Sequence, residues 1–208
     1  MFFAFLSPSL ADGQNSYRPP KGRVREQVRK TGGSRGCKMP LGDVVTLLIP
    51  QDHTASTISS HPTFFWHVSE QLSSKLRFTI LEAGQKPIYT QELTPEPGIV
   101  ALKLPNNSNP LEVGKTYRWT VTVICNEEKP SRNLFAQAWI ERVPATNIKH
   151  HSTSVRVFCT ENYAQMGLWY DALHCAHLRY QSGNPRSKKA LASFWSLLME
   201  VDLHSLFQ

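Results

Sequence analysis

The sequence predicts a mainly β protein, in which a β-sandwich over residues 41–144 is followed by a short α-helical domain over residues 145–208 that packs on it. Seven short apolar runs separated by turn-forming residues fill the first part. After Pro144 the hydrophobic period lengthens from that of a strand to that of a helix. Seven strands in about a hundred residues match the size of an immunoglobulin-like sandwich.

Two of the strand-like runs clearly place apolar side chains at every second position, as strands with one buried face do. In one run Leu76, Phe78 and Ile80 share a face, and in another Tyr117 and Trp119 do so. The runs are VVTLLI (44–49), TFFWHV (63–68), KLRFTILE (75–82), PIYTQEL (87–93), GIVALKL (98–104), TYRWTVTVIC (116–125) and LFAQAWIERV (134–143). We therefore expect strands with one inward face over each of these ranges.

The helical part is predicted from apolar residues at helical spacing. Trp169, Leu173 and Ala176 lie along one face of a helix that ends at Gly183-Asn184-Pro185. A last helix over about residues 187–201 buries an apolar face of its own. Two or three short helices expose too much apolar surface to stand alone, so we expect them to pack on the sandwich.

The net charge of +7 is concentrated near the start of the chain. Residues 18–38 hold eight Lys and Arg residues against the single acid Glu26, which accounts for the whole excess. This stretch is rich in Pro and Gly and poor in apolar residues, so we expect residues 12–40 to form a solvated, disordered tail. Such a tail can hold a membrane surface or a polysaccharide, whereas a nucleic-acid reader normally carries its charge on a folded face.

Residues 1–11 are interpreted as the remnant of a signal peptide. The run MFFAFLSPSLA ends in Ser9-Leu10-Ala11, which has the small residues that a signal peptidase accepts, but it lacks a basic start and a long apolar run. We expect the upstream part to be missing from this sequence and the protein to be periplasmic or extracellular. The alternative is the frayed apolar terminus of a cytosolic protein.

The four cysteines bear on the same question. Cys125 falls on the inward face of its strand run, and Cys37 stands just before the first run. A Cys37–Cys125 disulfide would tie the tail to the sandwich, which requires an oxidising compartment. We expect Cys159 and Cys175, in the helical part, to be reduced core residues.

No group of residues stands out as a catalytic, cofactor-binding or metal site. Asp52-His53 and Ser59-Ser60-His61 bring carboxylate, hydroxyl and imidazole close in sequence, but a catalytic triad needs an exposed nucleophile and a positioned base. His174-Cys175-x-His177 has metal-binding residue types but lacks the second pair of ligands of a structural zinc site. We therefore expect a protein without enzyme activity, cofactor or metal.

Three aromatic residues of the helical part are candidate partner-binding residues. Trp169, Tyr170 and Trp195 offer more aromatic area than a short helical cap needs, and aromatic side chains dominate binding hot spots. The alternative is that they belong to the core.

Two local patterns resemble fibronectin type III modules. His61-Pro62-Thr63-Phe64-Phe65-Trp66 resembles the second strand of such a module with its core tryptophan. Leu111-Glu112-Val113-Gly114-Lys115-Thr116-Tyr117 resembles the L-x-x-G-x-x-Y entry to the sixth strand, whose tyrosine bonds back to the preceding loop. The resemblance implies a sandwich core that contains Trp66, Tyr117 and Trp119.

The stretch from about residue 32 to the C-terminus resembles the cyanobacterial domain-of-unknown-function family 928. The matching residues are Arg35-Gly36-Cys37, Leu47-Leu48-Ile49-Pro50, His61-Pro62-Thr63-Phe64-x-Trp66, Pro97-Gly98-Ile99-Val100, Leu111-Glu112-Val113-Gly114-Lys115-x-Tyr117-Arg118-Trp119, Tyr163-Ala164 and Gly167-x-Trp169-Tyr170-Asp171-Ala172. The resemblance implies an exported protein without an established activity. The helical part is also similar to half of a tetratricopeptide repeat, and a single copy favours a helical hairpin that caps the sandwich.

The sequence thus favours an exported binding or structural module whose partner is a protein of the cell envelope. An accessory enzyme or carbohydrate-active module, using a cleft between sandwich and helices, is the first alternative. Cytosolic binding of an anion or nucleic acid through the basic tail, residues 18–38, is the second.

Overall fold

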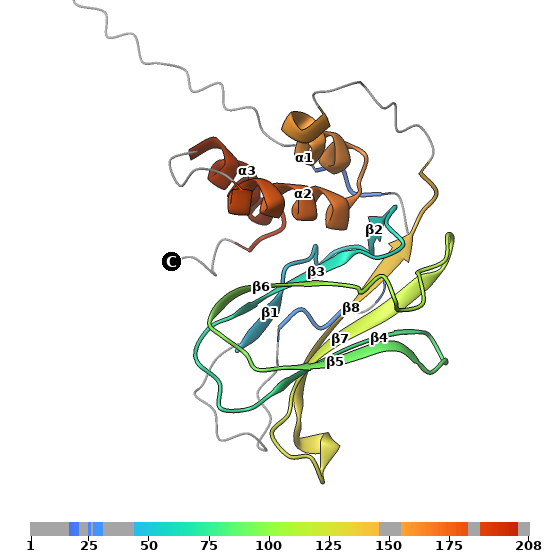
Figure 1. The fold of residues 1–208 in the computed structure, drawn as a ribbon, viewed down its shortest axis with the longest axis vertical. Helices are drawn as coiled ribbons and strands as arrows, with labels where there is room; N and C mark the ends of the chain where they lie inside the picture. The colour runs from blue at the N-terminus through green and yellow to red at the C-terminus, as the bar shows by residue number, and fades with distance from the viewer. Residues whose placement is uncertain are drawn as a thin grey trace, which may run out of the picture.

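The computed structural model describes residues 17–20, 25, 27–30, 44–145, 155–182 and 188–203. Within them strands come first and helices last, so the protein is mainly β with a C-terminal helical part, as predicted (Figure 1). The strands are β1 (Val45–Leu47), β2 (Ala55–Thr57), β3 (Thr63–Val68), β4 (Leu76–Glu82), β5 (Pro87–Leu93), β6 (Gly98–Lys103), β7 (Thr116–Val123) and β8 (Leu134–Arg142). A 3₁₀ turn, Pro130–Arg132, precedes β8, and the helices are α1 (Val155–Gln165), α2 (Trp169–Ser182) and α3 (Lys188–Met199).

The strands form two sheets. One has the order β1-β3-β6 and the other the order β2-β8-β7-β4-β5. All pairs are antiparallel except β2 with β8, which run parallel in the register Ala55 opposite Ile140. Each predicted run contains one strand. The sequence did not predict β2, because its residues Ala-Ser-Thr include no large apolar side chain.

Aromatic side chains from the two sheets meet between them. The ring of Phe64 on β3 lies 5.0 Å from that of Phe78 on β4 and 5.0 Å from that of Trp119 on β7. Trp66 and Trp119 are 0% exposed and Tyr117 is 2% exposed. Buried and partly exposed residues alternate without exception along β7, because one face of that strand turns toward the other sheet.

The three helices gather at one end of the two sheets, with α2 against β2 and β3 (Figure 1). Gly167 follows the end of α1, and its left-handed φ of 73° allows its N–H to donate to Ala164 O and that of Leu168 to donate to Tyr163 O. This C-terminal motif turns the chain directly into α2. Buried residues of α2 and α3 belong to the same hydrophobic core as those of the sheets, so the helical part packs on the sheets as expected.

The cysteines of the helical part form a disulfide, which corrects the expectation that Cys159 and Cys175 are reduced. The two residues lie about equally far before and after Gly167, on helices that run back along each other, and their Cα atoms are 6.2 Å apart. This separation is within the range that a disulfide bridges. The predicted bridge from Cys125 stays a prediction, because Cys37 lies outside the described residues; Cys125 itself is disulfide-bonded.

Part of the basic tail lies against the folded body, so the expectation of a solvated tail is wrong for the described residues. We call these residues, Tyr17–Pro20, Arg25 and Gln27–Lys30, the N-terminal strap. The prediction failed because it counted apolar residues, whereas the strap is held by hydrogen bonds of its backbone and of its side chains. The signal-peptide interpretation of residues 1–11 concerns residues outside those described. No helix in the described ranges is long and apolar enough to cross a membrane.

Candidate functional site

The N-terminal strap joins the two sheets along one side. Val28 exchanges two backbone hydrogen bonds with Gln137 on β8, of 2.9 and 2.7 Å. Two residues later Lys30 forms an antiparallel bridge with Thr46 on β1, and Leu47 N–H donates to Arg29 O at 2.8 Å. Because β8 and β1 belong to different sheets, the strap pairs with one strand of each sheet.

Arg29 connects the strap to the end of α3. Its side chain is buried, and its guanidinium donates to Val201 O at 2.9 Å and to Asp202 O at 2.8 Å. Burial lowers the pKa of Arg29 from its ordinary value, and the nearby carboxylate of Asp202 opposes that shift. These carbonyls follow the last turn of α3, so the strap fixes the position of that helix end.

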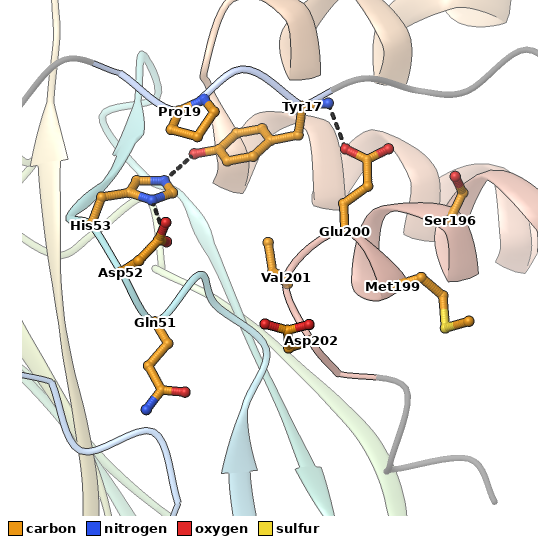
Figure 2. A pocket seen from close by; sticks show the side chains of 10 residues that line it. All are labelled: Tyr17, Pro19, Gln51, Asp52, His53, Ser196, Met199, Glu200, Val201 and Asp202. Atoms are coloured by element: carbon orange, nitrogen blue, oxygen red, sulfur yellow. Dashed lines mark hydrogen bonds and ion pairs between the residues drawn. The ribbon is translucent and has the colours of Figure 1, made fainter.

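Tyr17 connects the other end of the strap to two segments, the end of α3 and the loop that carries His53 (Figure 2). Its N–H donates to Glu200 Oε2 at 2.5 Å, and its hydroxyl is 2.7 Å from His53 Nε2. His53 Nδ1 is in turn 2.7 Å from Asp52 Oδ1. A carboxylate only accepts, so Nδ1 carries the proton and the Tyr17 hydroxyl donates to Nε2.

A cleft of about 630 Å³ opens beside Tyr17, between the strap, the loop that carries His53 and the end of α3. We call it the strap cleft. Figure 2 shows its lining residues, which are Tyr17, Pro19, Gln51, Asp52, His53, Ser196, Met199, Glu200, Val201 and Asp202. Three of them carry carboxylates, and Met199 is 60% exposed. The cleft therefore offers negative charge next to apolar surface.

The polar groups of the strap cleft hydrogen-bond to one another and hold the strap in place. Burial raises the pKa of the Tyr17 hydroxyl far above its ordinary value, so the group that faces His53 is a neutral phenol. Burial also raises the pKa of Glu200, and the hydrogen bond from Tyr17 N–H opposes that shift. The line Asp52–His53–Tyr17 resembles the order of a catalytic triad, but its last member is a poor nucleophile at neutral pH.

A second, smaller cleft of about 250 Å³ lies where α2 meets the β2–β3 turn and β6; we call it the Asp171 cleft. Asp171 Oδ2 accepts from Ile58 N–H at 3.1 Å, and the Thr57 hydroxyl also bonds to this side chain. Burial nevertheless raises the pKa of Asp171 to about 6. Burial and the nearby charge of Lys103 lower the pKa of His174, whose buried Nδ1 has no hydrogen-bond partner among the residues that the structure describes.

The candidate partner-binding aromatics fall mainly in the core. Trp169 and Tyr170 are 0% and 1% exposed, which overturns their proposed place on the surface, while Trp195 is partly buried. Trp169 Nε1 donates to Leu48 O at 2.9 Å, and Tyr170 Oη accepts from Trp119 Nε1 at 2.8 Å. These two side chains fasten α2 to both sheets.

The other residues singled out in the sequence separate in the structure. Asp52 and His53 stay together and line the strap cleft. His61 lines the Asp171 cleft, where its Nδ1 is 3.0 Å from Ser60 Oγ. His177 packs its ring on Phe65 instead of facing a metal site. Among the described residues, no three His, Cys, Asp or Glu side chains come together as metal ligands would.

Sequence reasoning missed the residues that build the strap cleft from far apart in the chain. Tyr17 and Arg29 were placed in a solvated tail, and Glu200 and Asp202 follow the last helix without any motif. The one available signal was the isolated tyrosine before Pro19-Pro20 in a stretch otherwise poor in apolar residues. An aromatic residue in such a stretch suggests an anchor.

The fold and the two clefts define a mainly β protein whose helical cap, closed by its own disulfide, is strapped to two sheets. The protein belongs to the family described as Domain of Unknown Function (DUF928), whose sequence profile matches residues 30–208. The match begins at the last residue of the strap, so Tyr17 to Arg29 precede the matched part. No curated protein sequence matches the chain.

Proposed function

We propose that the protein is an exported, non-catalytic binding module of the cell envelope. The two sheets serve as a scaffold of fibronectin III type, and the strap cleft receives a protein partner. The carboxylates of Asp52, Glu200 and Asp202 beside the exposed Met199 suit a basic side chain with an apolar stem, such as a lysine or arginine of that partner. This combination of charge and apolar surface in one open cleft carries the proposal.

Two further observations support the parts of this proposal. The Cys159–Cys175 disulfide is consistent with an oxidising compartment. Glu112 N–H donates to Tyr117 Oη at 2.8 Å, the bond back to the preceding loop that the fibronectin-like corner implies.

Site-specific photocrosslinking in the native cells tests the binding proposal. A photoreactive residue at position 199, in place of Met199, should give a covalent adduct with a partner. The matched control is position 113, because Val113 is also apolar and 52% exposed but does not line the strap cleft. Neutralising the cleft with Asp52→Asn, Glu200→Gln and Asp202→Asn should abolish the adduct. Equal adducts at positions 199 and 113 would exclude the strap cleft as the binding site.

Export is tested separately by a peptide map of the protein from its own cells, made without reducing agent. We expect a mature N-terminus near Asp12 and both the Cys37–Cys125 and Cys159–Cys175 linkages. An intact N-terminus with four free thiols would overturn the export proposal.

A carbohydrate-active role at the Asp171 cleft is the second candidate. Hydroxyl, imidazole, ammonium and carboxyl groups line that cleft together, as the sites that bind sugar hydroxyls require. Binding of envelope oligosaccharides that is lost in His174→Ala but kept in the strap-cleft variants would favour this function.

A further inference from the structure

Residues Tyr17–Pro20 lie in a groove made by segments distant in sequence. The Arg18 N–H donates to Ala164 O on α1 at 3.0 Å, and the Tyr17 N–H donates to Glu200 after α3. Both contacts use the backbone of residues 17 and 18. Figure 2 shows the segment crossing above the strap cleft, with the Tyr17 ring directed toward His53.

The floor of the groove requires a glycine. A Cβ atom added to Gly167 would lie 2.7 Å from Arg18 O, closer than atoms pack, and 3.3 Å from Pro20 Cδ, which is a tight contact. The segment and the α1–α2 turn therefore approach each other as closely as two backbones allow. Any side chain at position 167 would close the groove.

The side chain of Tyr17 is the anchor of the segment. Its ring stacks on that of His53 at 5.5 Å and meets the edge of Trp169 at 5.1 Å, and its hydroxyl bonds to His53. Pro19 and Pro20 follow it. An extended, proline-containing peptide with one aromatic anchor, held by backbone contacts in an aromatic-lined groove, is a common form of peptide recognition.

We propose that this groove is a peptide-recognition site for an extended Tyr-x-Pro-Pro segment, and that a second copy of the chain can supply the segment in exchange for the chain's own. The match to the family begins at residue 30, so the segment is appended to the part that forms the groove. Every contact it makes in one chain can be made equally between two copies, which is the condition for exchange of a terminal arm. The groove shares Tyr17, Pro19, His53 and Glu200 with the strap cleft, but this inference does not rest on the proposed function, because it is argued from the chain's own contacts and needs no envelope partner.

A labelled peptide tests the proposal. An acetylated peptide of residues 17–20 with a C-terminal fluorophore is titrated with the full chain and with its Tyr17→Ala variant, and anisotropy is measured. Weakening the chain's own segment removes a competitor at high effective concentration, so the variant should bind the peptide roughly tenfold or more tightly than the wild type. The Tyr180→Ala variant is the control, since Tyr180 is exposed and lies outside the groove. The peptide with its tyrosine replaced by alanine should not bind.

Light scattering completes the test. Wild-type protein should form a concentration-dependent dimer that Tyr17→Ala lacks. Three outcomes would each overturn the proposal. The peptide could fail to bind folded Tyr17→Ala, or the two peptides could bind equally. The Tyr17→Ala chain could also be unfolded, which would mean that the groove does not exist without its occupant. A strictly monomeric wild type would overturn the exchange between copies. None of these outcomes depends on the crosslink at position 199.

Discussion

Single side chains decide how the N-terminal strap is held. Arg29 is a buried cation whose described polar partners are two carbonyl oxygens. On burial the guanidinium loses its hydrogen bonds to water, and these two well-placed acceptors replace them. A planar fork can reach two adjacent carbonyls, which a lysine ammonium cannot do in the same way. Arg25, four residues earlier, is exposed and lies over the Trp139 ring at 4.6 Å.

These two arginines give a matched pair for mutation. Arg29→Ala leaves Val201 O and Asp202 O without their donor and opens a cavity, so we expect the free energy of unfolding to fall by about 2 kcal/mol or more. Arg25→Ala removes one exposed cation–π contact and should cost about 0.5–1 kcal/mol. Urea unfolding of both variants measures the difference. Equal losses would mean that the contacts of Arg29 with the end of α3 contribute little.

The alternation of strand side chains predicted the buried residues of the sheets well, but no local pattern could have predicted the role of Arg29. Phe78 and Trp119 are buried because they lie on the inward face of a strand. The alternation of apolar and polar residues around them in the sequence already shows this. Arg29 is buried because it packs against its acceptors at the end of α3. These acceptors lie more than 170 residues away in the sequence, so no local pattern reveals them. Composition places a basic residue at the surface unless such a partner is known.

Among whole elements, the least predictable were those that depend on pairing. β2 has three small residues and exists through its parallel register with β8. The strap likewise takes part in both sheets through Val28 and Lys30. By contrast, the long strands and the α1–α2 hairpin follow from periodicity and from the glycine that ends α1. The pairing of Cys159 with Cys175 follows once that hairpin is drawn, because it brings the two positions together.

The disulfide of the hairpin has a measurable effect on stability. It closes a loop with a sequence separation of 16 residues, and cross-linking a loop of that size stabilises the folded state by about 3 kcal/mol. The double variant Cys159→Ala, Cys175→Ala should lower the free energy of unfolding by that order. Wild-type protein treated with a reductant should lose at least as much, whereas the variant should respond less. An unchanged unfolding midpoint in the variant would show that the packing of α1 on α2 holds the hairpin without the bridge.

Across the whole molecule, sheets, helices and strap share one hydrophobic core. Three hydrogen bonds join the start of α2 to the sheets and the segments that follow their strands. They pair Trp169 with Leu48 O, Tyr170 with Trp119 Nε1, and Asp171 with Ile58 N–H. Two of these side chains looked like surface anchors in the sequence, because large aromatics in a short helical cap exceed what the cap itself can bury. The sheets bury the excess, which only the assembled structure shows.

Asp171 makes this junction sensitive to pH. Burial raises the pKa of Asp171 from 3.8 to about 6, with the bonds from Thr57 and Ile58 opposing the shift. The folded state therefore binds the proton more tightly than the unfolded state does. This group favours folding fully below about pH 4, and its contribution falls by about 3 kcal/mol in all as pH rises through 6 to about 7. Glu200 shifts in the same direction, whereas the lowered pKa of His174 acts oppositely at low pH.

The variant Asp171→Asn isolates this contribution. Asparagine is neutral at every pH and its oxygen can still accept from Ile58 N–H, so the variant should match the wild type at pH 4 and exceed its free energy of unfolding by about 1–3 kcal/mol at pH 7.5. Asp171→Ala, which also removes the acceptor, should be less stable than Asp171→Asn throughout. Urea unfolding at pH 4 to 7.5 measures the difference from wild type, which cancels the titration of Glu200 and His174. A difference that does not change with pH would mean that the charged carboxylate is fully compensated at the junction, and the raised pKa would be wrong.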